Sequence, residues 1–278
     1  MKKKSKKFSV IMSLYDGIET ELYKKSLKSL IKQTYLPKEI IIVLDGVKKK
    51  QLIKETINFK KKFKNLKIIK NLKNLGISKS YNKAIKAASF KIIAIQDSDD
   101  VSLSRRFESQ YNYIVSKKHI SVLGSSVYEK NLDTGKTILK QNPLKLSEIK
   151  KNLCFRNPMS HPTVMFKKKV LTLSGGYKDI NRMEDYHLWI RLINTDIVFE
   201  NLKKPLVIMN VKENFFLRRT GLNLVKSEIL IQLLLFRCGM NNFFIMIVLM
   251  FIKSFYHLTP SIIKKIIRLF YFRNLLNK

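Results

Sequence analysis

The feature that most limits the fold is an alternation of two hydrophobic periods over roughly the first 100 residues. Apolar runs that suit buried strands occur at residues 8–14, 39–46, 66–71 and 91–97. The stretches between them show helical spacing, and in the first of these the apolar positions are Leu22, Leu27, Leu30 and Ile31. Strands that alternate with helices predict an α/β domain with a parallel, doubly wound sheet and right-handed crossovers.

Three aspartates lie at or just after the ends of these predicted strands. Asp16 follows the first run, Asp45 stands at the end of the second and Asp97 ends the fourth. In an open parallel sheet, ligands bind beyond the carboxyl ends of the strands. The topology therefore predicts a ligand site at the edge where these carboxylates lie.

The segment QDSDD at residues 96–100 places three carboxylates in four positions, in a chain with 20 acidic and 55 basic residues. One interpretation is a solvated turn whose aspartates cap the following helix. Another is a calcium loop of the EF-hand type, in which Asp99 and Glu108 would be the third and twelfth residues. Val101 and Ser102 then occupy the positions of a required ligand and of the turn glycine, which excludes this class of site. A third interpretation is a carboxylate pair that holds Mg²⁺ or Mn²⁺ against nucleotide phosphates, and the strand-end position favours it.

The formal net charge of +35 has two interpretations. It indicates an anionic partner, such as nucleic acid, an acidic membrane surface or a phosphorylated substrate. Alternatively, it reflects a lysine-rich codon usage that places lysine on every solvated face. Because lysines occur throughout the chain, charge alone does not separate the two.

Cysteine content and the start of the chain bear on the compartment. Cys154 and Cys238 are too few for a disulfide framework or a thiolate zinc site, and a reducing cytosol is expected. The basic start resembles a signal peptide, but its apolar core stops at Asp16 and no cleavage site of small residues follows.

Beyond Arg105 the pattern becomes less regular. It predicts a helix to about Ser116, a strand near residues 120–129, a loop at 156–166 and a Gly-Gly turn. An amphipathic helix is expected at 184–195, with its core-facing positions at Leu188, Trp189 and Leu192. We expect two parts, a domain at residues 8–215 and a helical tail at 222–278.

Six segments, taken in order, are similar to family 2 glycosyltransferases, an inverting class. They are FSVIMSLYDG, SLIKQTYLPKEIIIVLDG, NLGISKSYNKAI, IAIQDSDDVSLSRRF, NPMSHPTVMFKK with GGY, and MEDYHLWIRL. Within that family the chain most resembles bacterial enzymes of exopolysaccharide and lipopolysaccharide synthesis, of the amylovoran-biosynthesis kind. The resemblance covers about residues 8–211. It implies one nucleotide-sugar-binding (GT-A-like) domain with a mostly parallel sheet, and a hexosyltransferase-type activity (EC 2.4).

The resemblance also implies roles for single residues. Asp45 would contact the nucleotide base, while Asp97 and Asp99 fall on the family's DxD motif, near the ribose and the metal-bound diphosphate respectively. Asp185 falls on the general base. The implied cofactor is Mn²⁺ or Mg²⁺, and the expected donor is a UDP-sugar.

Two positions depart from the family pattern. Leu44 and Val47 flank Asp45-Gly46, where Asp-Asp-Gly-Ser is usual. Tyr81 precedes Asn82 where many members have a basic residue, so Lys79 is the nearest cation and the candidate donor contact. Both departures concern recognition of the nucleotide.

These residue types suit the transfer of a sugar. Negative charge grows on the departing diphosphate, which a divalent cation stabilises, and a positioned carboxylate accepts the proton of the acceptor hydroxyl. Glu184 lies beside Asp185, and its like charge is expected to raise the pKa of the Asp185 carboxylate.

Further candidates for acceptor or diphosphate contacts are Glu184, His161, Arg218 and Arg219. No second His or Cys stands at metal-ligand spacing from His161, so we do not expect it to bind metal. Guanidinium groups at 218 and 219 suit phosphate oxygens, although a solvated helix start explains them equally well.

Two other classes of function remain as alternatives. A nucleic-acid-binding protein would account for the charge, but no zinc-finger, helix-turn-helix or aromatic-plus-basic sheet motif is present. A nucleotidyltransferase would also join aspartates to metal and nucleotide, but it is expected to have a Gly-rich, basic loop after the first strand, which LYDGIET is not.

The tail predicts attachment to a membrane. Glu228 is the last acidic residue, and the following 50 residues hold seven Lys or Arg. The apolar run 243–252 is too short to span a bilayer, which takes about 20 residues. Residues 259–270 form an expected basic amphipathic helix, which either packs on the core or lies on an anionic surface. We therefore expect a cytoplasmic enzyme, peripheral on the inner face of the cytoplasmic membrane, whose glycan acceptor is lipid-linked.

Overall fold

The first half of the chain is a parallel sheet with alternating helices. The computed structural model describes residues 5–212, 220–260 and 263–264. Its first four strands are β1 (Ser5–Leu14), β2 (Leu36–Asp45), β3 (Leu66–Asn71) and β4 (Ile92–Ile95). They are joined in turn by the helices α1 (Thr20–Ile31), α2 (Lys50–Lys62) and α3 (Ile77–Ala87). The pairs β1–β2, β2–β3 and β1–β4 are all parallel. All four predicted strands are confirmed.

The second half extends this sheet with strands of both directions. Its strands are β5 (Val101–Ser102), β6 (Ile120–Asn131), β7 (Thr137–Lys140), β8 (Met165–Lys167) and β9 (Val198–Val211). Its helical segments are α4 (Arg106–Ser116), α5 (Leu146–Leu153), the 3-10 turn η1 (His161–Thr163), α6 (Lys168–Leu173) and α7 (Glu184–Leu192).

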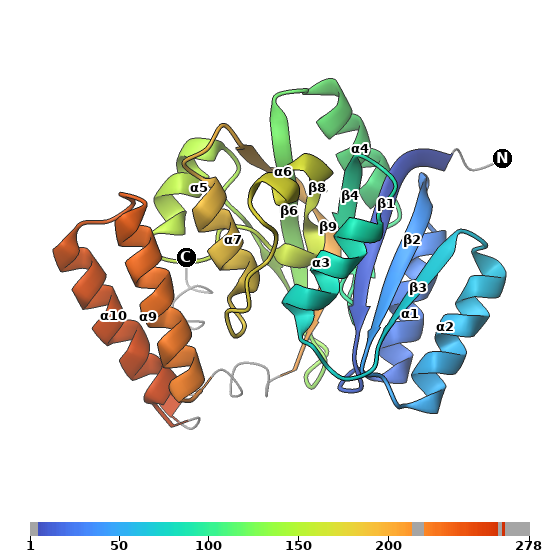
Figure 1. The fold of residues 1–278 in the computed structure, drawn as a ribbon, viewed down its shortest axis with the longest axis horizontal. Helices are drawn as coiled ribbons and strands as arrows, with labels where there is room; N and C mark the ends of the chain where they lie inside the picture. Colours follow the sequence, from blue (N-terminus) through green and yellow to red (C-terminus); the bar gives the residue numbers. More distant parts are fainter. Residues whose placement is uncertain (1–4, 213–219, 261–262, 265–278) are drawn as a thin grey trace.

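The sheet has the strand order β3-β2-β1-β4-β8-β6-β9-β5, with β7 beside β6 (Figure 1). Because β8 is antiparallel to both β4 and β6, while β6 and β9 are parallel, six strands run one way. The three that run the other way are β5, β7 and β8. The expected α/β fold with a mostly parallel sheet is confirmed.

Each face of the sheet buries its own apolar layer. Along β1, Val10 and Met12 join the layer under α1, α2 and α4, whereas Ile11 joins the layer under α3 and α7. On β2, Ile40 and Ile41 divide in the same way. This alternation follows from the two-residue period of a strand, and it explains why these runs are continuously apolar.

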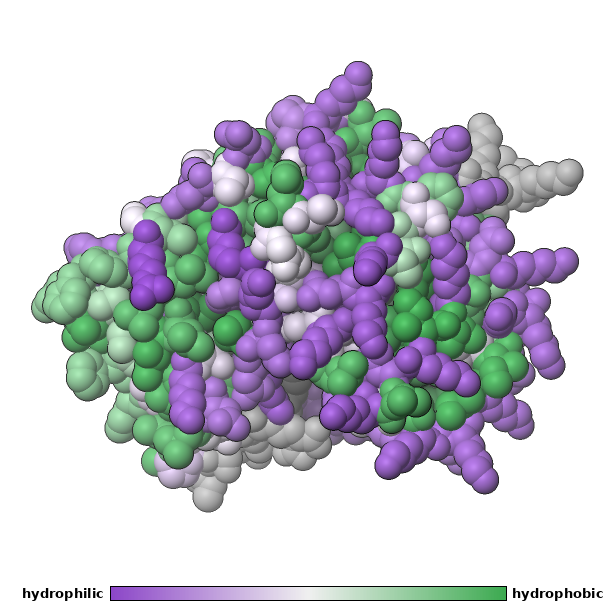
Figure 2. Space-filling view, in the orientation of Figure 1, coloured by the Kyte–Doolittle hydropathy of each residue, from purple (hydrophilic) through white to green (hydrophobic). Residues whose placement is uncertain are grey.

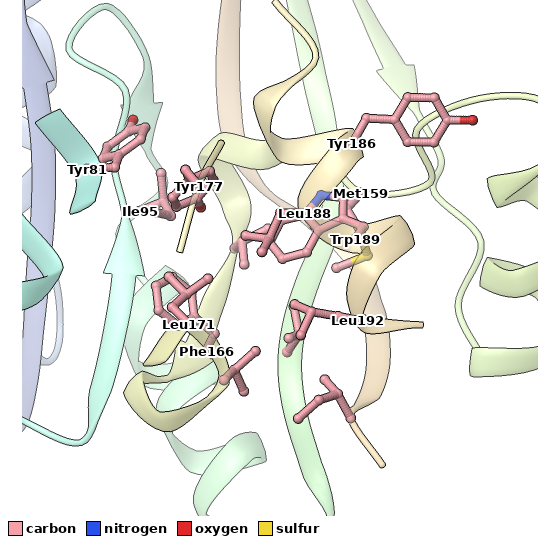
Figure 3. Packing of buried hydrophobic residues seen from close by; sticks show 14 of the residues in the cluster. Tyr81, Ile95, Met159, Phe166, Leu171, Tyr177, Tyr186, Leu188, Trp189 and Leu192 are labelled. Atoms are coloured by element: carbon pink, nitrogen blue, oxygen red, sulfur yellow. The ribbon is translucent and has the colours of Figure 1, made fainter. Parts of the chain in front are cut away.

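The core under α7 is built around an aromatic side chain. Trp189 is buried together with Leu188 and Leu192, as expected for this amphipathic helix. Its ring makes an edge-to-face contact with Phe199 of β9 at 5.8 Å between centroids. Figure 3 shows Met159 beside this cluster. The helix that carries Asp185 is therefore fixed to the sheet by its apolar face.

The tail begins as part of the domain. The helix α9 (Leu222–Arg237) buries Ile231 and Leu235 in the core layer under α7. It pairs with α10 (Phe243–Leu258), and these two helices form the hairpin at the left of Figure 1. Of the amphipathic helix expected at residues 259–270, the structure describes residues 259–260 and 263–264, and the others lie outside the described residues. Among the helices that the structure describes, none is long and apolar enough to cross a bilayer.

Candidate active site

The aspartate-rich segment follows β4 and is anchored to β9. Asp100 is buried, and its Oδ1 accepts a hydrogen bond from the backbone N of Asn210 at 2.9 Å. The Asn210 side chain donates to the backbone oxygen of Asp99 at 2.6 Å. Arg105 stands at the N-cap of α4 without a side-chain cap bond, so these aspartates do not cap that helix. The capping interpretation is wrong, and the segment is instead part of the edge of the sheet.

The carboxylates of this segment repel one another in a partly buried place. Burial raises the pKa of Asp99 to about 6, and the charge of Asp97 contributes to this shift. Burial also raises the pKa of Asp100 well above its usual range, with smaller effects from Asp99 and Asp97. A divalent cation would relieve this repulsion. The donor set fits Mg²⁺ or Mn²⁺, which are held by one or two carboxylates together with phosphates.

The buried guanidinium of Arg106 holds the aspartate-rich segment in place. Arg106 is fully buried, and its Nη1 donates to Gln96 Oε1 at 3.0 Å and to Ser102 Oγ at 2.9 Å. Its Nη2 donates to the backbone oxygen of Ile95 at 2.6 Å, and its Nε to Gln110 Oε1 at 3.2 Å. Burial lowers the pKa of this guanidinium to about 9, while the charges of nearby carboxylates act in the opposite direction. Residues 96–102 are thereby held at both ends.

Three rings surround the carboxylate of Asp97. The hydroxyl of Tyr81 donates to Asp97 Oδ1 at 2.7 Å, and Nδ1 of His161 lies 3.9 Å from the same oxygen. The Nε2 of His161 lies within hydrogen-bond distance of the Tyr177 hydroxyl, at 3.0 Å. Tyr81 and Tyr177 pack against each other with centroids 5.6 Å apart, and Figure 3 labels both at one end of the core cluster. His161 is therefore placed at the candidate site, next to Asp97.

The Gly-Gly-Tyr turn is held by two of the other matching segments. The side-chain amide of Asn82 pairs in both directions with the backbone of Tyr177, at 2.9 Å each way. The Nη2 of Arg191 donates to the backbone oxygen of Gly176 at 2.6 Å. Gly176 has φ +74°, and a Cβ there would lie 2.4 Å from Asn82 Oδ1, so only glycine fits. These contacts explain why Asn82, the glycine and Arg191 occur together in the motif pattern.

Asp185 lies in the first turn of α7 and has an orienting partner. Its Oδ2 accepts a hydrogen bond from Asn157 Nδ2 at 2.7 Å, and its Oδ1 accepts from the backbone N of Tyr186 at 2.8 Å. Beside it, burial raises the pKa of Glu184 to about 7, and the charge of Asp185 adds to this shift. Burial is the larger of these two causes.

Tyr177 connects the two groups of carboxylates. Burial raises its pKa well above the usual range, and the charges of Asp185, Asp97 and Glu184 act in the same direction. Charges that follow β4 and charges that begin α7 thus act on a single ring. The fold has brought together residues almost 90 positions apart in the sequence.

Asp45 is buried at the end of β2 and organises the following loop. Its Oδ1 accepts hydrogen bonds from Asn71 Nδ2 and from the backbone N of Leu75, both at 2.8 Å. Its Oδ2 accepts one from the backbone N of Gly76 at 3.0 Å. The contact of Asp45 with a nucleotide base stays a prediction. It would use further hydrogen bonds that these two carboxylate oxygens can still accept.

Other strand-end groups have structural partners or stay at the surface. Asp16 accepts hydrogen bonds from the backbone N of Lys48 and of Lys49, which lie just before α2. Lys79 is exposed on α3, whereas Lys83 on the same helix donates to Asn71 Oδ1 at 2.6 Å. Arg218 and Arg219 lie outside the described residues.

Several residues of this edge were missed by sequence reasoning. They are Arg106, Asn157 and Tyr177, together with the hydroxyl of Tyr81. Tyr81 had one signal, because it replaces an expected cation. Arg106, Asn157 and Tyr177 lie within the matching segments, but the match assigned them no role, and only their contacts show what they do. Among the described residues, no group of three or more His, Cys, Asp or Glu is placed to hold a metal ion.

Comparisons with known proteins agree on the family. The sequence profile of "Glycosyl transferase family 2" matches residues 9–172. The amylovoran biosynthesis glycosyltransferase AmsE of Erwinia amylovora is 32% identical over 222 residues, which are 80% of this chain and 83% of that protein. A galactosyltransferase of Escherichia coli, named UDP-Gal:alpha-D-GlcNAc-diphosphoundecaprenol beta-1,3-galactosyltransferase, is 30% identical over 272 residues, or 95% and 98% of the two chains.

A solved structure supports the fold. The mannosyltransferase PcManGT of Pyrobaculum calidifontis, in complex with GDP-Man and Mn²⁺, superposes with a TM-score of 0.61 at 14% identity. The match covers 91% of this chain and 70% of that one. At this identity the likeness concerns the fold alone.

The raised pKa of Glu184 predicts a pH dependence of stability. Because its pKa in the fold, about 7, exceeds the ordinary value of 4.5, the protonated form stabilises the fold below about pH 4.5. That contribution is lost as pH rises to about 7 and the group ionises. Compared with Glu184→Gln, the wild type should therefore lose free energy of unfolding over this range, measured by urea denaturation.

The exposed Glu21 is the matched control, because a hydrogen bond from Lys24 lowers its pKa. Compared with Glu21→Gln, the wild type should lose no free energy of unfolding between pH 4.5 and 7. Parallel stability curves for the wild type and Glu184→Gln between pH 4.5 and 7 would contradict the assignment.

Proposed function

The chain belongs to glycosyl transferase family 2, and we propose that it transfers a sugar from a UDP-sugar, with inversion and with a divalent cation, to a lipid-linked glycan in bacterial polysaccharide synthesis. The family makes it a nucleotide-sugar glycosyltransferase. The observation that carries the proposal is the arrangement of Asp97, Glu184 and Asp185 around Tyr177, with Asp99 beside Asp97.

The donor would lie across the carboxyl ends of β1, β2 and β4. Asp45 is proposed to contact the base, and Tyr15, which follows β1 and is 45% exposed, offers a ring for it to stack on. Asp97 is proposed to contact the ribose. Lys79 and Lys83 on α3 add positive charge near this path. The E. coli relative takes UDP-Gal according to its name, which supports a uridine donor.

The diphosphate would lie at Asp99. Its carboxylate is partly buried and is repelled by the charge of Asp97. Binding of a divalent cation would therefore stabilise the ionised carboxylate more than water does. Asp99 would hold Mn²⁺ or Mg²⁺, and Arg106 holds the segment in place from below. When bound, the cation offsets the charge of the diphosphate. The Mn²⁺ in the complex of PcManGT is consistent with this choice.

The acceptor would be activated by Asp185. Its carboxylate takes the proton as the acceptor oxygen attacks the anomeric carbon, and the bond from that carbon to the diphosphate oxygen breaks with its electron pair. Attack on the face opposite to the leaving group inverts the anomeric centre. Asn157 keeps the carboxylate oriented. Glu184 and His161 are proposed to contact the acceptor or the diphosphate.

A membrane-borne acceptor accounts for the surface of α10. Phe244, Phe251 and Phe255 are 73–76% exposed, and Val248 and Leu258 continue the same face at helical spacing. Figure 2 shows this apolar surface in green at the left of the molecule. Beyond Glu228 the sequence holds cations but no carboxylate, which suits an anionic surface. The E. coli relative is named for an acceptor on diphosphoundecaprenol, a lipid.

The apolar face would insert at the level of the head groups, with the enzyme peripheral on the inner face of the cytoplasmic membrane. The hairpin keeps that face outward, because α9 is packed into the domain. In this way the enzyme would meet its lipid-linked acceptor.

Substitution of Asp99 by Ala should abolish Mn²⁺-dependent binding of UDP, because the variant lacks the hard oxygen ligand at the diphosphate. Titration calorimetry with UDP, with and without Mn²⁺, measures this. Asp196→Ala, at an exposed position before β9, is the control and should bind as the wild type does. Undiminished dependence on Mn²⁺ in Asp99→Ala would refute the metal assignment.

Asp185→Asn should lower kcat by about 10²–10⁴-fold and leave the affinity for UDP near normal, because it removes only the proton acceptor. Turnover is measured as UDP release from UDP-galactose with a GlcNAc-diphospholipid acceptor, or with the active pair found in a panel of UDP- and GDP-sugars. The exposed Asp179→Asn serves as the control. A variant that keeps more than about a tenth of wild-type turnover would exclude Asp185 as the base. Release of pyrophosphate would instead indicate a nucleotidyltransferase.

Replacement of Phe244, Phe251 and Phe255 by Ser should abolish flotation of the protein with anionic liposomes, because the variant lacks the inserting side chains. The matched control replaces Phe155, Leu173 and Leu72, which are also exposed but lie elsewhere. Truncation before α9 is unsuitable, since it would uncover the core. Equal binding of both variants would disprove attachment through α10. A wild-type dimer that the triple Ser variant breaks, without liposome binding, would assign the face to a second copy.

A further inference from the structure

A cavity of about 680 Å³ lies at the edge of the sheet opposite to the aspartates. It is lined by the segment between α3 and β4, by the last turn of α4 and the residues after it, and by the junction of β8 with α6. These parts lie in the upper half of Figure 1. Ile92, which begins β4, and Asp97 are separated by roughly 15 Å of extended chain. The cavity is therefore separate from the candidate active site.

The lining of the cavity is rich in lysine. It includes five lysines, Lys91, Lys118, Lys167, Lys168 and Lys169. Burial lowers the pKa of Lys167, and the charge of Lys169 contributes. Among the described residues that line the cavity there is no carboxylate. The repulsion between Lys167 and Lys169 would be relieved by an anion.

Two of these lysines are held in place by the backbone. Lys168 Nζ donates to the backbone oxygen of Ala88 at 2.6 Å, and Lys167 Nζ donates to the backbone oxygen of Lys118. Carbonyl partners position the ammonium groups without cancelling their charge. The nearby carboxylate of Glu39 does not cancel it either, because it forms an ion pair with Lys67 at 2.7 Å and accepts hydrogen bonds from Ser89.

The rest of the lining is mostly apolar. It consists of Phe90, Ile92, Ile114 and Val115, together with the hydroxyl-bearing Ser89 and Thr172. A volume of this size and an apolar wall with a few charged groups are typical of small-molecule sites. A small inorganic anion would satisfy the lysines but would leave the apolar wall against water.

We propose that this cavity binds an amphiphilic phosphate, that is, a phosphate ester whose apolar group lies against Phe90, Ile114 and Val115 while the phosphate contacts the lysines. Multiply charged phosphate oxygens suit several ammonium groups at once. The apolar group supplies affinity by removing the wall from water. This inference does not depend on the proposed transfer reaction.

The cavity and the candidate active site share their supporting elements. At their other ends, α3 carries Tyr81, α4 begins with Arg106, β4 leads to Asp97 and η1 with His161 precedes β8. A ligand in the cavity would therefore contact the same helices and strands that position the carboxylates. Since the two sites lie at opposite edges, we expect an amphiphilic phosphate and UDP with Mn²⁺ to bind at the same time.

The test measures binding of octyl phosphate to the full chain by titration calorimetry, with octyl glucoside and inorganic phosphate as probes for the apolar part and the anion alone. The wild type should bind octyl phosphate at least about tenfold more tightly than either of these probes, and UDP with Mn²⁺ should not displace it. Displacement by UDP would overturn the proposal by placing the ligand at the carboxylate edge. Equal affinity for inorganic phosphate would overturn it by showing that only an anion binds.

The variant that replaces Lys91, Lys118 and Lys169 by Gln should bind octyl phosphate at least about tenfold more weakly. These three lysines are exposed, so the change should leave the fold intact. The control makes the same charge change at Lys60, Lys61 and Lys62, in the last turn of α2. Equal loss in both variants would show a general charge effect and would refute the site.

A second variant keeps the test independent of the lysines. Val115→Asp places a carboxylate in the cavity wall at a position that is 46% exposed, and it should weaken binding by a similar factor. Leu139→Asp on β7 is the control, because that residue has nearly the same exposure outside the cavity. Unchanged binding in Val115→Asp would overturn the assignment. This is also the result expected if octyl phosphate binds to the exposed face of α10 instead of the cavity.

Discussion

The arrangement of the carboxylates depends on one fully buried cation. Arg106 gives up its hydration, and four hydrogen bonds replace it. The chain of hydrogen bonds continues through Gln110, which donates to the backbone oxygens of Leu123 and Thr163. This network crosses the sheet where β8 reverses the strand direction between β4 and β6. It therefore joins the parallel half and the mixed half at the point where the aspartate segment leaves the sheet. A buried charge is tolerated only when most of its donors are paired in this way.

The same constraint gives the carboxylate edge its chemistry. Because the network holds residues 96–102 at both ends, Asp97 and Asp99 cannot move apart to relieve their repulsion. The rings of Tyr81 and Tyr177 and the imidazole of His161 exclude water from one side. Under the proposed function, a site held in this way would be preorganised for a cation and a diphosphate, since little reorganisation would remain to be done on binding. Asp185 reaches the same place from α7, whose apolar face is fixed by Trp189.

Within the hairpin, α10 is attached to α9 by a contact of similar design. Glu228 is buried in α9, with its carboxylate 2.9 Å from Lys253 Nζ and 3.7 Å from His257 Nε2 of α10. Burial acts to raise the pKa of Glu228, but the contacts with His257 and Lys253 lower it overall. The charged contact between the helices leaves the phenylalanines of α10 facing outward. The apolar helix α10 is thus held on α9 by the contacts of Glu228 with Lys253 and His257.

The sequence by itself determined the order of the elements and the position of the carboxylates along them. Periods of two and 3.6 residues are local properties, so the four early strands, α7 and the strand-end positions of Asp45 and Asp97 could be predicted from the residues alone. The similarity of the motifs then indicated the family. Tertiary structure alone decided which side chains meet. Tyr177, Asn157 and Arg106 stand in the matching motifs, but their roles could not be predicted, since these come from contacts across 16 to almost 100 positions or from burial that no local pattern encodes. The packing of α9 and the lysine cavity likewise arise only where distant segments come together, because charge and apolar surface acquire a partner only in three dimensions.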